Sequence, residues 1–144
     1  MSTFHKELYS DMILEIKCGS YQGRKIKAKP GLLYSVIIMI EEASITDNRI
    51  YFNKSSEEYY KNVFTSIGED PTPFFKPFYY MQFDGLWHLK GKTEVVKTNR
   101  PSPKYIRENV EYAFLDYALG DLLQEAEIRE HFKSIIKSHF FNKY

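Results

Sequence analysis

Cysteine is almost absent from this sequence, since Cys18 is the only one among 144 residues. A single thiol forms no disulfide within the chain and no cysteine-based zinc site. This scarcity is typical of proteins in a reducing compartment, so we expect a cytoplasmic location. The longest apolar run, Val36 to Ile40, is far too short to cross a bilayer. The first residues also lack the basic-then-apolar pattern of a signal peptide.

Patterns that carry catalysis are missing as well. The sequence contains no glycine-rich phosphate loop and no nucleophile elbow. The adjacent pairs Glu41-Glu42 and Glu57-Glu58 point apart on a helix, so neither forms a paired-carboxylate site. The four histidines show no metal-ligand spacing: His5, His88, His131 and His139. We therefore expect no catalytic residues, no metal and no cofactor, and rank an enzyme with an unrecognised site last among the functions considered.

The composition is that of a globular protein. Hydrophobic residues make up 43% and charged residues 27% of the chain, and aromatics reach 17% with 12 Tyr and 11 Phe. The length fits one domain with a substantial core. We find no repeat and no internal boundary, and predict a single domain over residues 1–144.

Charge is segregated although its net value is only +1. Residues 17–29 carry five basic side chains and no acid, and residues 90–107 carry six against Glu94 alone. Residues 108–130 reverse the balance, with seven acids against Arg129. A near-neutral chain with this pattern can present one basic face to a polyanion. The alternative is that each run is a solvated loop.

The first half of the chain predicts three helices. Residues 3–17 space Phe4, Leu8, Met12 and Ile16 four apart on one face, with Tyr9 and Ile13 beside them. Pro30 suits a first helical turn and opens an almost wholly apolar helix that ends near Ala43; its β-branched run also allows a strand, but its ends favour a helix. Residues 49–53 alternate like a short strand. A third helix follows from Ser55 or Ser56, with Gly68 ending it.

The second half predicts a hairpin and a helical pair. Residues 78–83 and 86–90 suggest two strands joined at Asp84-Gly85, with a third short strand at Val95-Val96. Residues 104–119 and 121–141 suggest two closing helices. We therefore predict a mostly helical α+β fold: a winged-helix-like core with a β-hairpin and a C-terminal helical pair. This topology serves nucleic-acid binding and protein contacts alike.

The most informative segment is the aromatic stretch from Phe74 to Leu89, which contains a proline. Most of its rings are expected to be core, including Trp87. The functional part is predicted to be the loop Phe75-Lys76-Pro77, because proline fixes the backbone and cannot pair into a sheet. The basic residues Lys25, Lys27 and Lys29 are expected nearby, and Arg100, Lys104 and Arg107 are expected to contact neighbouring phosphates.

Three blocks of the chain carry a family resemblance. Lys29 to Tyr34 opens the apolar helix, Pro77 to Met81 precedes Asp84 to Trp87, and Ala113 to Asp116 leads into closing segments that end at Phe140-Phe141. In order and spacing these blocks resemble the sulfur-binding domain of modification-dependent restriction proteins. That domain recognises phosphorothioate-modified DNA and is usually fused to an HNH nuclease. The resemblance covers roughly Lys29 to Phe141.

The resemblance implies a shallow apolar pocket for sulfur. Pro77 matches the pocket proline of the family and Lys29 matches the basic residue before the helical proline, while Phe75 and Tyr80 would line the pocket. Lys25, Lys27, Lys76, Arg100 and Lys104 complete the expected DNA contacts. The implied partners are double-stranded DNA, with or without phosphorothioate, and a nuclease effector that is either fused or separate. The implied setting is restriction or phage defence.

Three positions depart from the family pattern. Ala28 stands where the family has histidine, Lys76 stands where it has tyrosine, and Tyr80 stands where a small residue is usual. A lysine in place of tyrosine makes the pocket more attractive to an ordinary phosphate, and a tyrosine in place of alanine fills space. Both the sulfur preference and the flanking bases therefore stay open. The competing hypothesis is a winged-helix protein-interaction or regulatory module.

Overall fold

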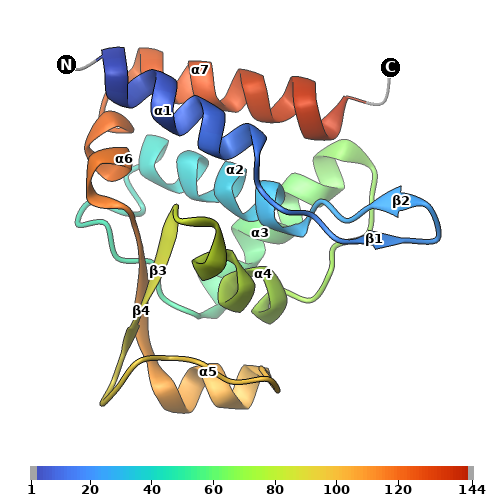
Figure 1. Cartoon of the computed structure of the whole chain (residues 1–144), viewed down its shortest axis with the longest axis vertical. Helices are drawn as coiled ribbons and strands as arrows, with labels where there is room; N and C mark the ends of the chain where they lie inside the picture. Colours follow the sequence, from blue (N-terminus) through green and yellow to red (C-terminus); the bar gives the residue numbers. More distant parts are fainter. Residues whose placement is uncertain (1–2, 143–144) are drawn as a thin grey trace.

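The structure is a computed structural model that describes residues 3–142 (Figure 1). Four helices and a small hairpin fill the first half, in the order α1 (Thr3–Leu14), β1 (Ser20–Tyr21), β2 (Arg24–Lys25), α2 (Ala28–Glu41), α3 (Lys54–Ile67) and α4 (Phe75–Tyr80). The second half comprises η1 (Met81–Asp84), β3 (Trp87–Gly91), α5 (Pro103–Asn109), β4 (Val110–Leu115), α6 (Tyr117–Leu122), α7 (Ala126–Ile136) and η2 (Lys137–Phe141). The predicted α+β class is confirmed. Among the described residues, no helix has both the length and the apolar character needed to span a membrane.

Helix α2 is the centre of the molecule, as the sequence predicts. Its side chains are buried on nearly every side, and it contacts α3, α4 and α7. Pro30 lies in the first turn, where its missing amide hydrogen leaves no helical bond unmade. Gly31 allows close packing, because a Cβ there would lie 2.6 Å from the ring of Phe64 on α3. Sequence and packing therefore agree on this helix.

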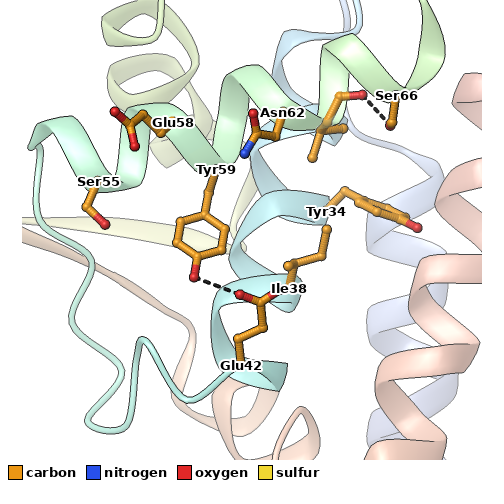
Figure 2. Close-up of a pocket in the computed structure, with 9 residues that line it drawn as sticks. Tyr34, Ile38, Glu42, Ser55, Glu58, Tyr59, Asn62 and Ser66 are labelled. Atoms are coloured by element: carbon orange, nitrogen blue, oxygen red, sulfur yellow. Dashed lines mark hydrogen bonds between the residues drawn. The ribbon is translucent and has the colours of Figure 1, made fainter.

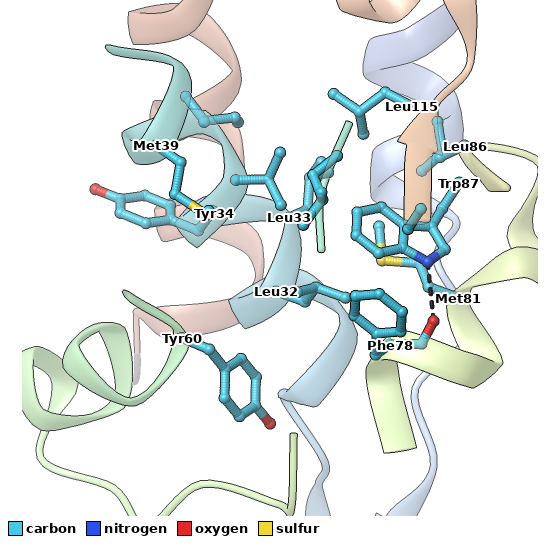
Figure 3. Packing of buried hydrophobic residues seen from close by; sticks show 14 of the residues in the cluster. Leu32, Leu33, Tyr34, Met39, Tyr60, Phe78, Met81, Leu86, Trp87 and Leu115 are labelled. Atoms are coloured by element: carbon cyan, nitrogen blue, oxygen red, sulfur yellow. Dashed lines mark hydrogen bonds between the residues drawn. The ribbon is translucent and has the colours of Figure 1, made fainter. Parts of the chain in front are cut away.

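Trp87 joins the sheet to α4 within the core (Figure 3). Its indole is fully buried, and Nε1 donates a hydrogen bond of 2.9 Å to the carbonyl oxygen of Phe78. The two rings meet edge to face with centroids 5.4 Å apart. Phe74 packs against Phe78 in the same way, and both contact Phe52. The predicted placement of these rings in the core is confirmed.

The main sheet pairs strands that are far apart in the sequence. β3 and β4 are antiparallel, with Trp87 opposite Leu115 and Leu89 opposite Ala113. Ile50 adds a single bridge to Ala113, with N–H···O distances of 2.8 and 2.7 Å. The strand predicted over residues 49–53 is therefore reduced to this one bridge.

The hairpin predicted at Asp84-Gly85 is wrong. Residues 75–84 are helical, and Gly85 ends the 3₁₀ turn with φ of 81°. The buried side chains Phe74, Phe78 and Met81 follow helical spacing, and Pro77 is tolerated because it falls in the first turn. The predicted recognition loop is thus a short helix. The small hairpin of the fold is β1–β2, where Ser20 pairs with Lys25.

The predicted C-terminal helical pair is wrong in its first member. Residues 110–115 form strand β4 because they pair with β3, and this pairing directs Ala113 and Leu115 toward the core. The predicted last helix is divided into α6, α7 and the π turn η2. The predicted third strand at Val95-Val96 does not form, although Val96 is buried.

Helix α1 and the residues that follow it bury only part of the predicted face. Tyr9, Ile13 and Ile16 are buried, whereas Phe4 and Leu8 are exposed to solvent. The helix packs against α6 and α7, so the side that carries Tyr9 is the one turned inward. Spacing alone did not identify the buried stripe because two overlapping stripes have the same period.

Candidate nucleic-acid interface

A surface pocket of about 260 Å³ gathers four of the predicted site residues: Lys29, Lys76, Pro77 and Tyr80. They come from the first turn of α2 and from α4. The remaining lining residues come from the segment after α1, from β2 to α2 and from the loop before α4: Lys17, Cys18, Gly19, Ile26, Ala28 and Thr72. Because α2 packs directly on α4, residues about 50 positions apart share one wall.

The inner surface of the pocket is apolar. Pro77 and Ala28 are buried, and Ile26 and Cys18 are half-buried beside them. Burial raises the pKa of the Cys18 thiol and outweighs the opposite effect of Lys25 and Lys29 nearby. The thiol therefore stays neutral at ordinary pH and behaves as part of the apolar wall.

One side of the pocket is held by a buried carboxylate. Asp84 accepts a hydrogen bond of 2.6 Å from Lys29 Nζ through Oδ2, and its side chain is only 5% exposed. Its other oxygen accepts the backbone N–H of Lys17 at 3.0 Å. Asp84 thus fixes both the lysine head group and the segment that follows α1.

The outer rim is aromatic and cationic. Lys76 is exposed and forms no ion pair with any residue between 3 and 142. Tyr80 is 40% exposed and meets Tyr79 edge to face, while Phe83 packs beside both. The pocket therefore combines an apolar interior with an unpaired positive charge at its mouth.

Two of the predicted lysines lie in a neighbouring groove rather than in the pocket. Lys25 and Lys27 line it together with Arg24 and Glu69. Lys27 forms an ion pair of 2.5 Å with Glu69, and the Lys25 ammonium lies over the ring of Phe140 at 5.4 Å. Their charges are adjacent to the pocket but are already partly engaged.

The other predicted site residues lie farther along the surface. Phe75 faces a different groove on α4, lined also by Phe52, Pro103 and Arg107, so the structure does not place it in the pocket. Arg100 and Lys104 are exposed near the start of α5. Their segment is attached to α4, because the Tyr79 hydroxyl bonds both the amide and the carbonyl of Thr98.

Sequence reasoning missed the partner that positions Lys29. The sequence predicts a turn at Asp84, and no local signal marks it as an acid buried against a lysine 55 positions away. The sequence also gives no sign that Cys18 and Ile26 line the pocket, because they lie within the basic run 17–29 and outside the aromatic stretch. Lys17 belongs to the same run, and only the structure places it at the pocket.

The hollow between α2 and α3 lacks this combination. It is lined by Glu42, Glu58 and Tyr59, whose hydroxyl donates to Glu42 at 2.9 Å (Figure 2). Its two carboxylates repel a polyanion. Within residues 3–142, no three His, Cys, Asp or Glu side chains cluster in a way that could hold a metal ion.

Comparison with known proteins gives matches among solved structures. No protein-family model matches the chain, and no curated protein matches it. The sulfur-binding domain of ScoMcrA complexed with phosphorothioated DNA is similar, with a TM-score of 0.71 and 18% identity over 98% of this chain and 89% of that one. This chain has the fold of that domain. The resemblance predicted from the three sequence blocks is thus confirmed at the level of the fold, and it extends to α1.

A larger structure gives the same result. The sulfur-binding and SRA domains of ScoMcrA, also complexed with phosphorothioated DNA, match with a TM-score of 0.73 and 17% identity. The match covers 97% of this chain but only 43% of that one. The present chain therefore spans less than half of the larger structure.

Proposed function

We propose that this protein is a DNA-binding module that reads a phosphorothioate in the DNA backbone. The observation that carries the proposal is the pocket in which Pro77, Ala28 and Cys18 form an apolar interior beside Lys29 and Lys76. Two solved structures with this fold are complexes with phosphorothioated DNA, which supports this choice of ligand.

The chemistry of the pocket suits sulfur in place of a non-bridging phosphate oxygen. Sulfur is larger and more weakly hydrated than oxygen, so it gains more from contact with a proline ring and a neutral thiol. The linkage still carries a negative charge, which Lys76 at the mouth attracts. Lys29 offers its ammonium from the first turn of α2, oriented by Asp84.

Neighbouring phosphates are expected to meet cations that are not paired within the described chain: Lys17, Arg24, Lys76, Arg100 and Lys104. About five such contacts give a slope of log affinity against log salt of roughly −4 to −5. The paired lysines Lys27 and Lys29 add to the local potential without adding a full counterion release each.

The β1–β2 hairpin projects from the body of the molecule between the end of α1 and the start of α2 (Figure 1), and the segments at its base contribute Lys17 and Lys29 to the pocket. Its tip exposes Tyr21, Gln22 and Arg24 to solvent. An amide and a guanidinium group can hydrogen-bond base edges in a groove while the pocket holds the backbone. We assign the reading of flanking bases to this tip.

We further propose that the chain is a reader without catalytic activity of its own. It would act in the cytoplasm in restriction or phage defence, with cleavage supplied by a nuclease effector that is fused or recruited. The protein-interaction alternative does not account for a pocket with these residues, and the fold comparison does not favour it.

The experiment is a binding comparison between short duplexes of one sequence. One duplex is unmodified, and two carry a single phosphorothioate of opposite configuration at phosphorus. A pocket on one side of the backbone engages only one of the two non-bridging atoms, so one stereoisomer is expected to bind tightest. Titrations at two salt concentrations give the electrostatic slope.

Matched variants assign the binding to the pocket. Lys76→Gln is expected to lower the affinity for all three duplexes and to make the slope of log affinity against log salt less negative by about 0.9. Lys61→Gln, which removes an exposed lysine on α3, is the control for net charge. Equal, salt-sensitive binding to all three duplexes would mean that DNA is bound without sulfur preference, and no binding to any would contradict the proposal.

A further inference from the structure

The outer face of the β3–β4 sheet is a band of aromatic side chains that the DNA interface does not use. Trp87, Leu89, Ala113 and Leu115 occupy the inner positions, so the alternate residues face outward. The outward side chains of the sheet and of the segments beside it are His88, Lys90, Tyr112, Phe114, Arg49, Tyr51 and Tyr117. Exposed aromatic bands of this kind mark interaction sites.

The rings of this band touch in sequence. The ring centroids of Tyr51 and Tyr112 are 6.0 Å apart, and those of Tyr112 and Phe114 are 6.1 Å apart. Phe114 stacks on Tyr117, with 5.6 Å between centroids and 22° between the ring planes. Tyr117 is 73% exposed, so one face of the stacked pair is open to solvent. Core packing does not explain a ring so exposed.

A groove of about 530 Å³ runs along the band, and its wall is rigid. The Asn48 side chain donates to the carbonyl of Leu115 at 2.9 Å and accepts its N–H at 3.0 Å. Gly120 lies against Asn48, where a Cβ would come within 3.1 Å. The backbone of Ile50 pairs with Ala113 of β4 and so fixes the segment that carries Arg49 and Tyr51. A preformed groove loses little entropy when it is filled.

The groove already holds one guanidinium group. Arg49 lies over the ring of Tyr112 with 4.6 Å between its Cζ and the ring centroid. The Asp47 carboxylate stands in the same wall and accepts the Arg49 backbone N–H at 3.2 Å. The chain's own arginine thus shows which group these rings accept.

The two ends of the band differ in charge, with cations at one end and carboxylates at the other. Arg49 and Lys90 lie at the Tyr112 end, where the cationic position is filled. Asp121 lines the groove near Tyr117, and Asp116 is joined to His88 beside Phe114 at 2.9 Å. An open aromatic pair flanked by carboxylates attracts a cation and repels nucleic acid.

We propose that this groove binds an arginine-bearing segment of a partner protein, with the guanidinium stacked on Phe114 and Tyr117 beside Asp121. Guanidinium is favoured over ammonium because it is planar, stacks on rings and bonds carboxylates through two donors. The inference does not depend on the proposed DNA function.

The two surfaces lie on opposite sides of α4. Phe78 of α4 accepts the bond from Trp87 on the inner face of the sheet, whereas Pro77 and Tyr80 line the DNA pocket. The sheet therefore separates the aromatic band from α4 and the pocket. A partner and DNA can bind at the same time, and the affinity for DNA is expected to be unchanged by the peptide.

The test uses isotope-labelled protein and short glycine–serine peptides. One peptide carries two arginines, and its matched forms carry two citrullines, two lysines or two glutamates. The arginine peptide is expected to give saturable shifts in the amides of residues 46–49, 112–117 and 120–121. The lysine peptide should bind more weakly, and the citrulline and glutamate peptides should not shift the resonances of these amides.

Variants decide whether the groove is responsible. Tyr117→Ala and Asp121→Asn change exposed side chains. Each is expected to lower the affinity for the arginine peptide at least about tenfold. Phe4→Ala, an exposed aromatic on α1, is the control and should have no effect. The proposal is overturned if no peptide shifts these amides, if citrulline binds as well as arginine, if both groove variants bind normally, or if an oligothymidylate shifts the same amides instead.

Discussion

Lys29 and Asp84 form the central ion pair of the candidate DNA interface, with 2.6 Å between Nζ and Oδ2. The lysine side chain is 17% exposed and the aspartate 5%, so the carboxylate is the buried partner. Asp84 also anchors the backbone of Lys17 across the pocket. The pair therefore reduces the positive charge of the pocket while it fixes the pocket's shape.

Removing that carboxylate should strengthen DNA binding and weaken the fold. Asp84→Asn leaves Lys29 unpaired, so the affinity for unmodified DNA should rise several-fold and the salt slope should become more negative by about 0.9. Loss of the charged hydrogen bond should cost about 1–3 kcal/mol of unfolding free energy. Binding titrations and urea unfolding measure both effects. Asp47→Asn raises net charge equally on the sheet groove, and an equal gain there would contradict the local explanation.

Tyr80 limits the size of the pocket. Tyr80→Ala should open it and increase the preference for phosphorothioated over unmodified duplex by roughly 1 kcal/mol, about fivefold, because more of the sulfur is removed from water. The comparison uses the same duplexes for wild type and variant. Phe83→Ala removes an exposed ring beside Tyr80 that does not line the pocket, and should leave the ratio unchanged. A lower ratio in the Tyr80 variant would mean that the phenol itself contacts the ligand.

Local signals were enough for the parts of the fold that form independently of distant partners. Pro30 in a first turn and an apolar run predicted α2, and Gly68 with φ of 71° ends α3 as expected. The pocket residues Lys29 and Pro77 came from the family resemblance, and the packing of α2 on α4 brought them together.

Local signals do not predict the pairing of strands that are far apart in the sequence. Val110 to Leu115 has a spacing compatible with a helix, and only pairing with β3 makes it a strand. The same pairing places Tyr112 and Phe114 beside His88, so the aromatic band was invisible until the register was known. Likewise, Asp84 acquires its role only when η1 meets the start of α2.

The Trp87 indole is expected to be a major source of stability. Trp87→Phe removes the donor to the Phe78 carbonyl and leaves part of a fully buried site empty. The expected loss is roughly 2–4 kcal/mol of unfolding free energy, measured by denaturant titration. Tyr117→Phe, a change at an exposed ring, should stay within about 0.5 kcal/mol of wild type. A comparably small loss for Trp87→Phe would show that the hydrogen bond is replaced.

The contact between Tyr9 and Asp116 should make stability depend on pH at both extremes. The Tyr9 hydroxyl donates to Asp116 Oδ2 at 2.5 Å, and burial together with this bond raises the pKa of Tyr9 from 10.0 to about 12. Burial acts to raise the pKa of Asp116, but hydrogen bonds from Tyr9 and His88 outweigh it and hold that pKa below 3.8. The neutral phenol and the charged carboxylate are thus the forms that the fold favours.

The signs of the two effects are opposite. Because the pKa of Tyr9 is raised on folding, its contribution is complete below pH 10.0 and is lost as the pH rises toward about 12. Because the pKa of Asp116 is lowered, its contribution is present above pH 3.8 and is lost as the pH falls further. Tyr9→Phe removes the bond, so its stability deficit against wild type should be constant near neutrality and shrink toward both extremes. Chemical unfolding across the pH range measures the difference, with Tyr117→Phe as the control tyrosine. A deficit that does not change with pH would mean that Tyr9 contributes through packing alone.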